Sequence, residues 1–210
     1  SNINMSRHRA VKNNQELLAI LKESDNAIQN GKSIINNVKA VYRCDEQEAN
    51  LNINTLVKES IDLYKKHRDY ENKKLNITFE PDKRIDSSNI KVSRTRILQA
   101  INNILLNAIQ AVNKNGKIFI NTGLHENKSG KKIINEVFIK IADNGCGIPK
   151  ELYNKIFLPR FTTKKNGTGL GLYLAKKFID EYERGHIEVE QSFFGEGTSF
   201  TIYIPIKENG

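Results

Sequence analysis

The chain has 210 residues, of which 27% are charged, and its formal net charge at pH 7 is +9. No run of residues reaches the roughly 18 apolar side chains of a membrane-spanning helix, and no signal-peptide pattern is present. The basic residues are scattered among 24 acidic ones without a recognition motif or an aromatic-interleaved basic strip, which argues against a nucleic-acid-binding protein. Cys44 and Cys146 are far apart and lack metal-ligand spacing, so we expect free thiols in a reducing, cytoplasmic compartment.

Residues 1–46 carry an apolar pattern with a period of seven. Four residues recur at this spacing and two more take interleaved positions: Leu21, Ile28, Ile35 and Tyr42, then Leu17 and Val38. Such a pattern is typical of a coiled coil or helical bundle, although Ser24 and Gly31 weaken the second seam position. The alternative is a single amphipathic helix that packs on its own domain.

The remaining residues, 47–210, alternate between helical and strand patterns. Helical periodicity covers 53–67, 92–113 and 171–183. Strand-like alternation covers 75–79, 117–122, 137–142, 186–191 and 199–204. The segment 124–132, rich in Lys, Asn and Gly, is expected to form an exposed hairpin loop. This order predicts an α+β fold, a two-layer α/β sandwich with a mixed sheet that helices cover on one face.

The helical segment 92–113 combines an apolar stripe with two asparagines, Asn103 and Asn107, which share a face because they are four residues apart. Asparagine is a mediocre helix former because its side chain competes for backbone hydrogen bonds. Its amide oxygen is a hard ligand of the kind that Mg²⁺ prefers. The functional interpretation is that Asn107 binds Mg²⁺ while Asn103 supports the metal or a phosphate. An exposed polar face, in an asparagine-rich chain, is the alternative.

Two glycine-containing segments follow. The first, at residues 143–149, reads Asp-Asn-Gly-Cys-Gly-Ile-Pro, and its glycines would let the backbone approach a flat heterocycle whose exocyclic amine donates to Asp143. The second, at residues 167–172, reads Gly-Thr-Gly-Leu-Gly-Leu and precedes a helical pattern, where free backbone N–H groups suit a phosphate. Each segment alone is as well explained by a turn or loop. In this order, after a helix that carries two asparagines, they predict a split nucleotide pocket.

Five motifs in sequence order resemble the boxes of the GHKL ATP-binding superfamily and, within it, those of the sensor histidine kinases of two-component systems. They are Asn103-Ile-Leu-Leu-Asn107-Ala108, Asp143-x-Gly145-x-Gly147, Phe157-x-Pro159-x-Phe161-Thr162-Thr163-Lys164, Gly167-x-Gly169-x-Gly171-Leu172 and Gly195-x-Gly197-Thr198. The third motif is typical of histidine kinases rather than of gyrase, heat-shock or mismatch-repair relatives. The resemblance covers roughly residues 50–206.

The resemblance implies roles for individual residues. Asp143 would recognise adenine, and residues 149–166 would form a mobile lid over ATP from which Lys164 and Lys165 reach phosphates; a solvated charged loop is the alternative for the lysines. The implied nucleotide-binding residues are Asp143, Gly145, Gly147, Ile148, Thr162, Thr163, Lys164, Gly167, Thr168, Gly169, Leu170, Gly171, Leu172 and Thr198. The implied catalytic residues are Asn103, Asn107 and Lys164, the first two of which would also hold Mg²⁺.

One substitution distinguishes enzymes within the superfamily. In the hydrolysing relatives, the position four residues before the metal-binding asparagine is usually a glutamate that activates water. This chain has Asn103 there, and an amide accepts no proton at neutral pH. A phosphoryl-transfer site needs mainly Mg²⁺, positive charge and an in-line acceptor. The resemblance therefore implies an ATP- and Mg²⁺-dependent protein histidine kinase whose protein partners are a response-regulator receiver domain and a second copy of the chain, joined through the N-terminal helices.

The phosphoacceptor of such kinases is a histidine followed by an acidic residue and often, a few positions on, by a proline. None of the four histidines resembles it: His8, His67, His125 and His186. The resemblance makes residues 1–46 part of a dimerisation-and-phosphoacceptor hairpin and residues 47–210 the ATP-binding catalytic domain. We therefore expect a piece of a longer kinase, whose upstream part is free to carry a membrane anchor. The alternatives are a kinase that phosphorylates a separate protein, a noncatalytic nucleotide-binding module, and a serine kinase of the anti-sigma type.

Overall fold

The computed structural model describes residues 48–206, except 88–89, 130–131, 165–166, 183 and 194–195, together with four isolated helical positions nearer the N-terminus, 17, 24, 28 and 31. Most of the heptad pattern predicted for residues 1–46 therefore lies outside the described residues, and so do Cys44 and His8. Cys146 is a free, exposed cysteine, as expected. Among the described helices, none combines the length and the apolar character needed to cross a membrane.

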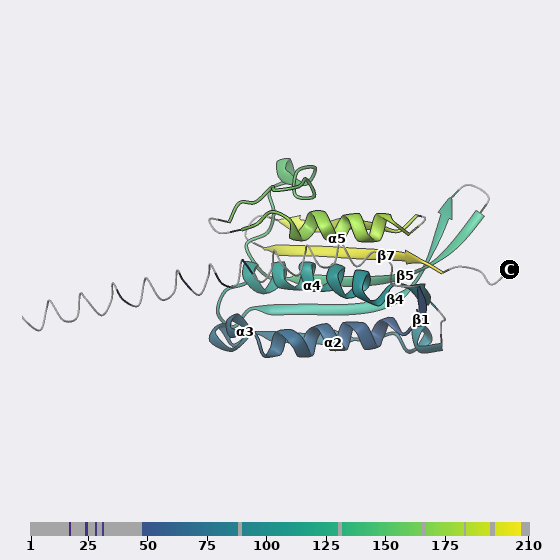
Figure 1. Ribbon diagram of the computed structural model, residues 1–210, viewed down its shortest axis with the longest axis horizontal. Coiled ribbons are helices and arrows are strands. Elements are labelled where there is room, and N and C mark those ends of the chain that lie inside the picture. The colour runs from purple at the N-terminus through teal and green to yellow at the C-terminus, as the bar shows by residue number, and fades with distance from the viewer. Residues whose placement is uncertain are drawn as a thin grey trace, which may run out of the picture.

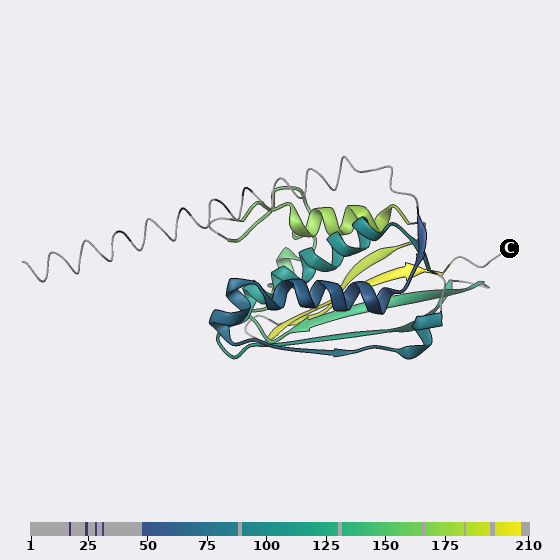
Figure 2. The ribbon, with the colours of Figure 1, turned by 60° about the horizontal axis from the view of Figure 1, so that its bottom comes forward.

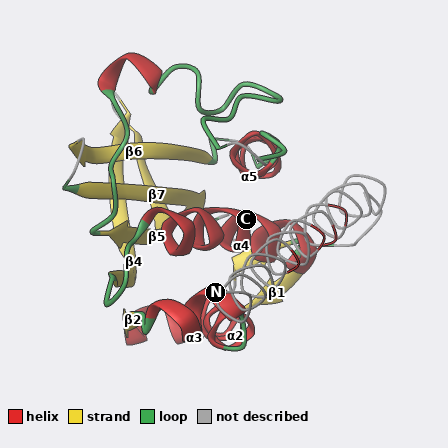
Figure 3. Ribbon diagram, turned by 90° about the vertical axis from the view of Figure 1, so that its left-hand side faces the viewer, coloured by secondary structure: helices red, strands yellow, loops and turns green. Residues whose placement is uncertain are grey.

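The described residues form two layers, a five-stranded sheet and a layer of helices on one of its faces (Figures 1 and 3). The strand order is β2 (Asn76–Glu80), β4 (Lys117–Ser129), β5 (Lys132–Asp143), β7 (Gly197–Pro205) and β6 (His186–Phe193). β2 pairs with β4 in parallel, and the other neighbours are antiparallel. The mixed sheet and the two-layer sandwich predicted from the sequence are confirmed.

Three helices cover the sheet, as Figure 2 shows: α2 (Ile53–Lys65), α4 (Arg94–Ala111) and α5 (Gly171–Asp180). Smaller elements complete the domain, namely the antiparallel pair β1 (Ala49–Leu51) and β3 (Ile90–Val92), the short helix α3 (Arg68–Lys73), and the 3₁₀ turns η1 (Lys83–Ser87) and η2 (Lys150–Leu152). The sequence patterns had predicted none of these smaller elements, because three to six residues are too few to show a period.

Helix α4 lies at the centre of the core. Its buried residues are those of the predicted stripe: Ile97, Ala100, Ile101, Ile104, Leu105, Ala108 and Ile109. Burying each isoleucine or leucine contributes about 1.5–3 kcal/mol, so this one face anchors the helix firmly to the sheet. The Oγ of Ser93 caps the helix by accepting the Arg96 N–H. The polar face that carries Asn103 and Asn107 is thereby held in a fixed orientation.

Several predicted boundaries were wrong. The helix predicted over 92–113 begins at Arg94, after β3, and ends at Ala111, and the helix predicted over 171–183 ends at Asp180. Residues 124–132 are not a loop, because β4 continues to Ser129 and β5 begins at Lys132, and their hairpin projects beyond the neighbouring strands (Figure 1). Backbone hydrogen bonds hold an antiparallel ladder together whatever the side chains are. A polar segment can therefore form such a ladder without showing an alternating side-chain pattern. Helix α2 ends at Lys65 rather than at residue 67, since the His67 ring accepts the Asp69 N–H and starts α3.

Candidate functional site

Three polar side chains meet beside α4. The Lys164 ammonium donates to the Asn107 Oδ1 at 2.9 Å and also to the Gln110 Oε1. Asn107 and Gln110 are three residues apart on one helix and therefore neighbours on its surface. The structure thus brings the predicted Asn107 and Lys164 together. Sequence reasoning missed Gln110, although its spacing from Asn107 was a signal that could have identified it.

Asn103 lies one turn earlier on α4, where α5 begins. A Cβ added to Gly171, the first residue of α5, would stand 3.6 Å from the Asn103 Oδ1, which is an ordinary contact distance. The Asn103 Nδ2 is buried and has no hydrogen-bond partner among the described residues. An unsatisfied buried donor costs about 1–3 kcal/mol, so this amide is suited to a polar ligand.

Asp143 is the last residue of β5, where the strand opens into the first glycine segment. Its Oδ1 accepts the Gly145 N–H at 2.8 Å, and Thr198 faces it across the β5–β7 ladder. Burial raises the pKa of Asp143 to about 6, although the backbone N–H groups of Gly145 and Thr198 and the charge of Lys164 favour the ionised form. The strand end therefore holds a partly desolvated carboxylate within electrostatic reach of the Lys164 ammonium.

Glycines are required around this carboxylate by close packing. A Cβ on Gly145 would lie 2.7 Å from the carbonyl oxygen of Ala111, and Cys146 donates its N–H to that oxygen. A Cβ on Gly197, whose φ is +112°, would lie 1.9 Å from the Asp143 carbonyl oxygen. The sequence had assigned Gly145 to the approach of a heterocycle. In the structure, the lack of a side chain at Gly145 lets the backbone come close to Ala111 at the C-terminal end of α4. This close approach fixes the position of Asp143 relative to the asparagines of α4.

Residues 160–164, which follow η2 in the chain, contact the second glycine motif, residues 167–172. Arg160 donates its N–H to the Gly169 carbonyl at 2.9 Å, and both residues have a positive φ. The Thr162 Oγ1 accepts the Lys164 N–H at 3.1 Å, and a Cβ on Gly167 would lie 2.2 Å from the same oxygen. These contacts place Lys164 within reach of α4. Lys165 lies outside the described residues.

The other predicted site residues are distributed as follows. The Thr168 Oγ1 accepts the Leu170 N–H at 3.4 Å at the entrance to α5. Ile148 and Leu172 are partly buried against the hydrophobic core. Gly147 has a φ of +70°, and Thr163 is exposed. Ile148 and Leu172 thus pack against the core.

Several groups around Lys164 influence its charge. Desolvation lowers the pKa of Lys164, and repulsion from Lys73 acts in the same direction, whereas Cys146 and Asp143 favour the charged form. Lys73 donates its ammonium to the carbonyls of Ile109 at 2.9 Å and Val112 at 2.9 Å, and also to that of Gln110. Lys73 therefore caps the C-terminal end of α4, a role that the sequence did not reveal.

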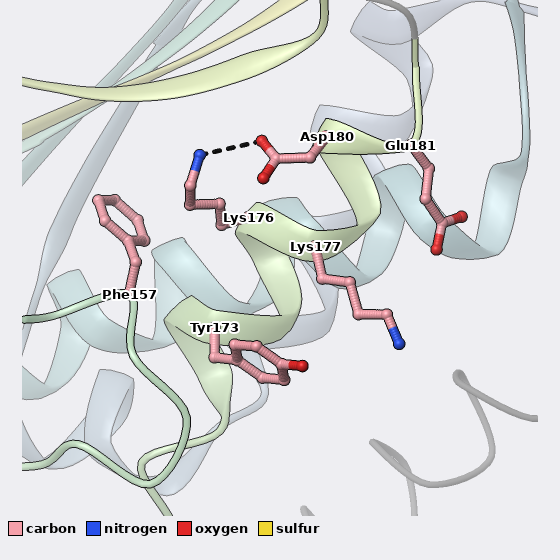
Figure 4. Close-up of a pocket in the computed structure, with 6 residues that line it drawn as sticks. All are labelled: Phe157, Tyr173, Lys176, Lys177, Asp180 and Glu181. Carbon is pink, nitrogen blue, oxygen red and sulfur yellow. Dashed lines mark hydrogen bonds and ion pairs between the residues drawn. The ribbon is translucent and has the colours of Figure 1, made fainter.

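A hollow in the surface lies elsewhere, on the outer side of α5 (Figure 4). This open depression has a volume of about 330 Å³ and is lined by Phe157, Tyr173, Lys176, Lys177, Asp180 and Glu181. The Lys176 ammonium pairs with Asp180 at 3.0 Å and lies 5.9 Å from the centroid of the Phe157 ring. Its lining contains none of the asparagines and glycines described above, so the candidate site is the cluster of Asp143, Asn103, Asn107 and Lys164.

Among the described residues, no group of three or more His, Cys, Asp or Glu could hold a metal ion. Asn107 and Gln110 offer amide oxygens at this site. Mg²⁺ commonly takes only one or two protein ligands and completes its shell with water and substrate phosphates. The amide oxygens of the site are compatible with Mg²⁺ that arrives together with a phosphorylated ligand.

Comparisons with known proteins agree with the resemblance seen in the motifs. The family model described as histidine kinase-, DNA gyrase B-, and HSP90-like ATPase matches residues 92–208. The signal transduction histidine-protein kinase AtoS of Escherichia coli (strain K12) is 42% identical over 123 residues, which are 59% of this chain and 19% of AtoS. The sensor histidine kinase ZraS of Salmonella typhimurium is 31% identical over 156 residues, which are 74% of this chain and 31% of ZraS. The chain thus spans a third or less of the length of these relatives.

Solved structures extend the comparison to the fold. The catalytic domain of the histidine kinase ThkA superposes with a TM-score of 0.61 at 32% identity, covering 76% of this chain and 96% of that one. The structure of ThkA in complex with the response regulator TrrA gives a TM-score of 0.63 at 29% identity, covering 89% of this chain and 52% of the ThkA chain.

Proposed function

Because the chain belongs to the family of histidine kinase-, DNA gyrase B- and HSP90-like ATPases, and within it to the catalytic domains of sensor histidine kinases, we propose that it transfers the γ-phosphoryl group of Mg²⁺-bound ATP to a histidine on a helical element. A response-regulator aspartate would receive the group next. The observation that carries the proposal is the meeting of Lys164 with Asn107 beside the Asp143 carboxylate. ThkA, a relative of known structure, is seen in complex with a response regulator.

The adenine end of the site consists of Asp143, Gly145, Thr198 and Gly197. Its ionised carboxylate accepts a hydrogen bond from the adenine amine, and a hydrogen bond to a charged group contributes about 1.5–3 kcal/mol. The N–H groups of Gly145 and Thr198 hold the carboxylate in place and keep it ionised near neutral pH. The position of Asp143 at a strand end, next to the C-terminal end of α4, sets the distance from adenine to the asparagines.

The phosphate end of the site consists of Asn103, Asn107, Lys164 and Gly171. The Asn107 oxygen already attracts a cation, the Lys164 ammonium, so it fits a metal ion. The buried Asn103 Nδ2 is a donor, which suits a phosphate oxygen better than a metal. When bound, Mg²⁺ would neutralise charge on the phosphates. Backbone N–H groups at the start of α5 add further donors for phosphate oxygens.

Transfer, rather than hydrolysis, follows from the absence of a base at position 103. The amide of Asn103 cannot take a proton from water, whereas an imidazole acceptor is itself nucleophilic in its neutral form. The residues of the site therefore orient the phosphate chain and stabilise its charge, and the acceptor histidine supplies the attacking nitrogen. Binding and orientation are the two tasks of this domain.

The domain organisation follows the same proposal. Residues 47–210 form the catalytic domain, and residues 1–46 contribute part of the dimerising helical hairpin on the cytoplasmic side. Two residues of the predicted seam, Leu17 and Ile28, are helical and each 55% exposed, so their apolar side chains are available to a second copy of the chain.

The test is a phosphorylation assay with radiolabelled ATP and Mg²⁺, on the chain alone and with a separate helix pair that carries a phosphoacceptor histidine. We expect acid-labile label on the added acceptor. Label on the chain alone would indicate an acceptor of its own, such as His8. Nucleotide binding without any transfer would favour a regulatory module over a kinase, and acid-stable label would favour a serine kinase.

A further inference from the structure

Lys164 reaches from the segment before α5 to two amide oxygens of α4. Its ammonium donates to the Asn107 Oδ1 at 2.9 Å and to the Gln110 Oε1. Gln110 lies at the exposed end of the helix, and neither oxygen carries a formal charge. The Lys164 ammonium is therefore held at two uncharged oxygens of α4. One of them belongs to Asn107, the residue proposed as a metal ligand.

The position of the ammonium is set by its backbone. The Lys164 N–H donates to the Thr162 Oγ1 at 3.1 Å, and Gly167 leaves space beside that oxygen because a Cβ there would lie 2.2 Å from it. Lys73 is held at the C-terminal carbonyls of α4 and repels the Lys164 charge. Lys164 is therefore retained against a neighbouring cation by its two amide partners, with the Asp143 carboxylate as a more distant attraction.

Amide oxygens that accept from an ammonium are also oxygens that Mg²⁺ can use. A dication on the Asn107 Oδ1 and an ammonium at 2.9 Å from the same atom would repel each other, because they are like charges only a few ångströms apart. We propose that Lys164 takes the place of the metal ion in the nucleotide-free chain, and that Gln110 is the positioning residue that retains it there. Arrival of the metal with its nucleotide then releases Lys164 towards the phosphates.

This inference rests on the proposed function, because it assumes a metal–nucleotide ligand, and it adds a role for Gln110 to it. Gln110 need not contact the nucleotide. It stabilises the nucleotide-free arrangement and so reduces the apparent affinity for the metal–nucleotide. Its removal weakens the retention of Lys164 and leaves the Asn107 oxygen in place. Without metal nothing competes with the ammonium for that oxygen, which still accepts from it, so removal of Gln110 has no consequence for the binding of nucleotide alone.

The experiment measures binding of a non-hydrolysable ATP analogue to the full chain by calorimetry, in a Mg²⁺ titration and in excess EDTA. For Gln110→Leu, we expect the half-saturating Mg²⁺ concentration to fall roughly threefold to tenfold, which is the effect of losing one solvent-exposed hydrogen bond of ordinary net strength from the nucleotide-free state. In EDTA, the variant and the wild type are expected to bind equally. Gln110→Ala, which also removes the amide, is expected to behave like Gln110→Leu.

A double-mutant cycle tests whether Gln110 acts through Lys164. In the Lys164→Met background, Gln110→Leu is expected to change nothing. Lys114→Met, which removes an exposed lysine just after α4, is the control for the loss of a positive charge. The same gain in both backgrounds would overturn the inference, and so would an equal gain in EDTA.

Two further outcomes separate the inference from the proposed function. A higher half-saturating Mg²⁺ concentration for Gln110→Leu would make Gln110 itself a ligand, and an unchanged concentration would mean that Gln110 does not retain Lys164. Either result would overturn the inference. The proposed function would still stand if nucleotide binding by the wild type depends on the metal. A wild-type chain that binds the analogue equally with and without Mg²⁺ would overturn both.

Discussion

The two ends of the site are built by different forces. At the adenine end, Gly145 and Gly197 let backbone meet backbone at distances that exclude a Cβ, so the geometry depends on steric packing. At the phosphate end, Lys164, Asn107 and Gln110 meet through the tips of long polar side chains, where Gly171 has ordinary space. Substitutions at the first end should therefore affect folding, and those at the second should affect ligands alone.

The largest effect is expected for Gly197→Ala. Its φ of +112° and the 1.9 Å approach to the Asp143 carbonyl leave no space for a methyl group without backbone movement. We expect a loss of at least about 3 kcal/mol in the free energy of unfolding, measured by urea denaturation without nucleotide. Gly171→Ala is the matched control, because its Cβ would be in ordinary contact at 3.6 Å. Equal losses in the two variants would remove the proposed difference between the ends.

Asp143→Asn should separate binding from folding within the adenine end. The amide retains an acceptor for the Gly145 N–H but loses the charge that accepts from adenine. We expect ATP affinity to fall by about 1.5–3 kcal/mol, measured by calorimetry. The nucleotide-free protein should become more stable at pH 7–8, because a partly desolvated charge is removed. Unchanged ATP affinity would exclude Asp143 from adenine recognition.

The pH dependence of Asp143 gives opposite signs for stability and binding. Its pKa in the folded protein, about 6, is above the ordinary aspartate value of 3.8. The stability that the protonated carboxyl contributes is therefore fully present below pH 3.8 and is lost as the pH rises through 6. This loss is on the order of 3 kcal/mol, since one pKa unit corresponds to about 1.4 kcal/mol. ATP binding should instead strengthen as the carboxylate ionises. Both slopes, between pH 4 and 7, should be absent in Asp143→Asn, and their persistence there would assign them to another group.

Asn107→Ala tests the phosphate end. The residue is only partly buried, so we expect a change in unfolding free energy below about 1 kcal/mol and loss of the Mg²⁺ dependence of nucleotide binding. Calorimetry with and without EDTA measures the second effect. Asn113→Ala, at an exposed position just after α4, makes the same chemical change and should leave the metal response intact. An unaltered metal response in Asn107→Ala would remove this residue from the site.

The smallest effect is expected for Lys73→Met, which removes the ammonium that caps α4. Losing its bonds to the carbonyls of Ile109, Gln110 and Val112 should cost about 1 kcal/mol of unfolding free energy. Lys73→Arg keeps the charge and should recover most of it, whereas Lys66→Met, at an exposed position, is the control for charge alone. A loss of the same size in Lys66→Met would mean that the cap contributes nothing.

Much of this arrangement could be predicted because it is periodic or local. The stripe from Ile97 to Ile109 identified α4 and its buried face, and alternating residues located the five strands of the large sheet. The order of the asparagines, Asp143 and the glycine segments indicated a nucleotide site. The long hairpin, α3 and the β1–β3 pair were missed because backbone hydrogen bonds, rather than side-chain periods, define them.

The sequence by itself determined the fold class, the face of α4 that enters the core, and the family, because hydrophobic periodicity and motif order are properties of the chain alone. Only the tertiary structure decided that Gly145 and Gly197 serve backbone packing, that Lys73 caps α4, and that Gln110 shares Lys164 with Asn107. These contacts join residues up to 57 positions apart in the chain, as for Lys164 and Asn107. Their distances depend on how helices and strands pack in three dimensions, which no local pattern of side chains records.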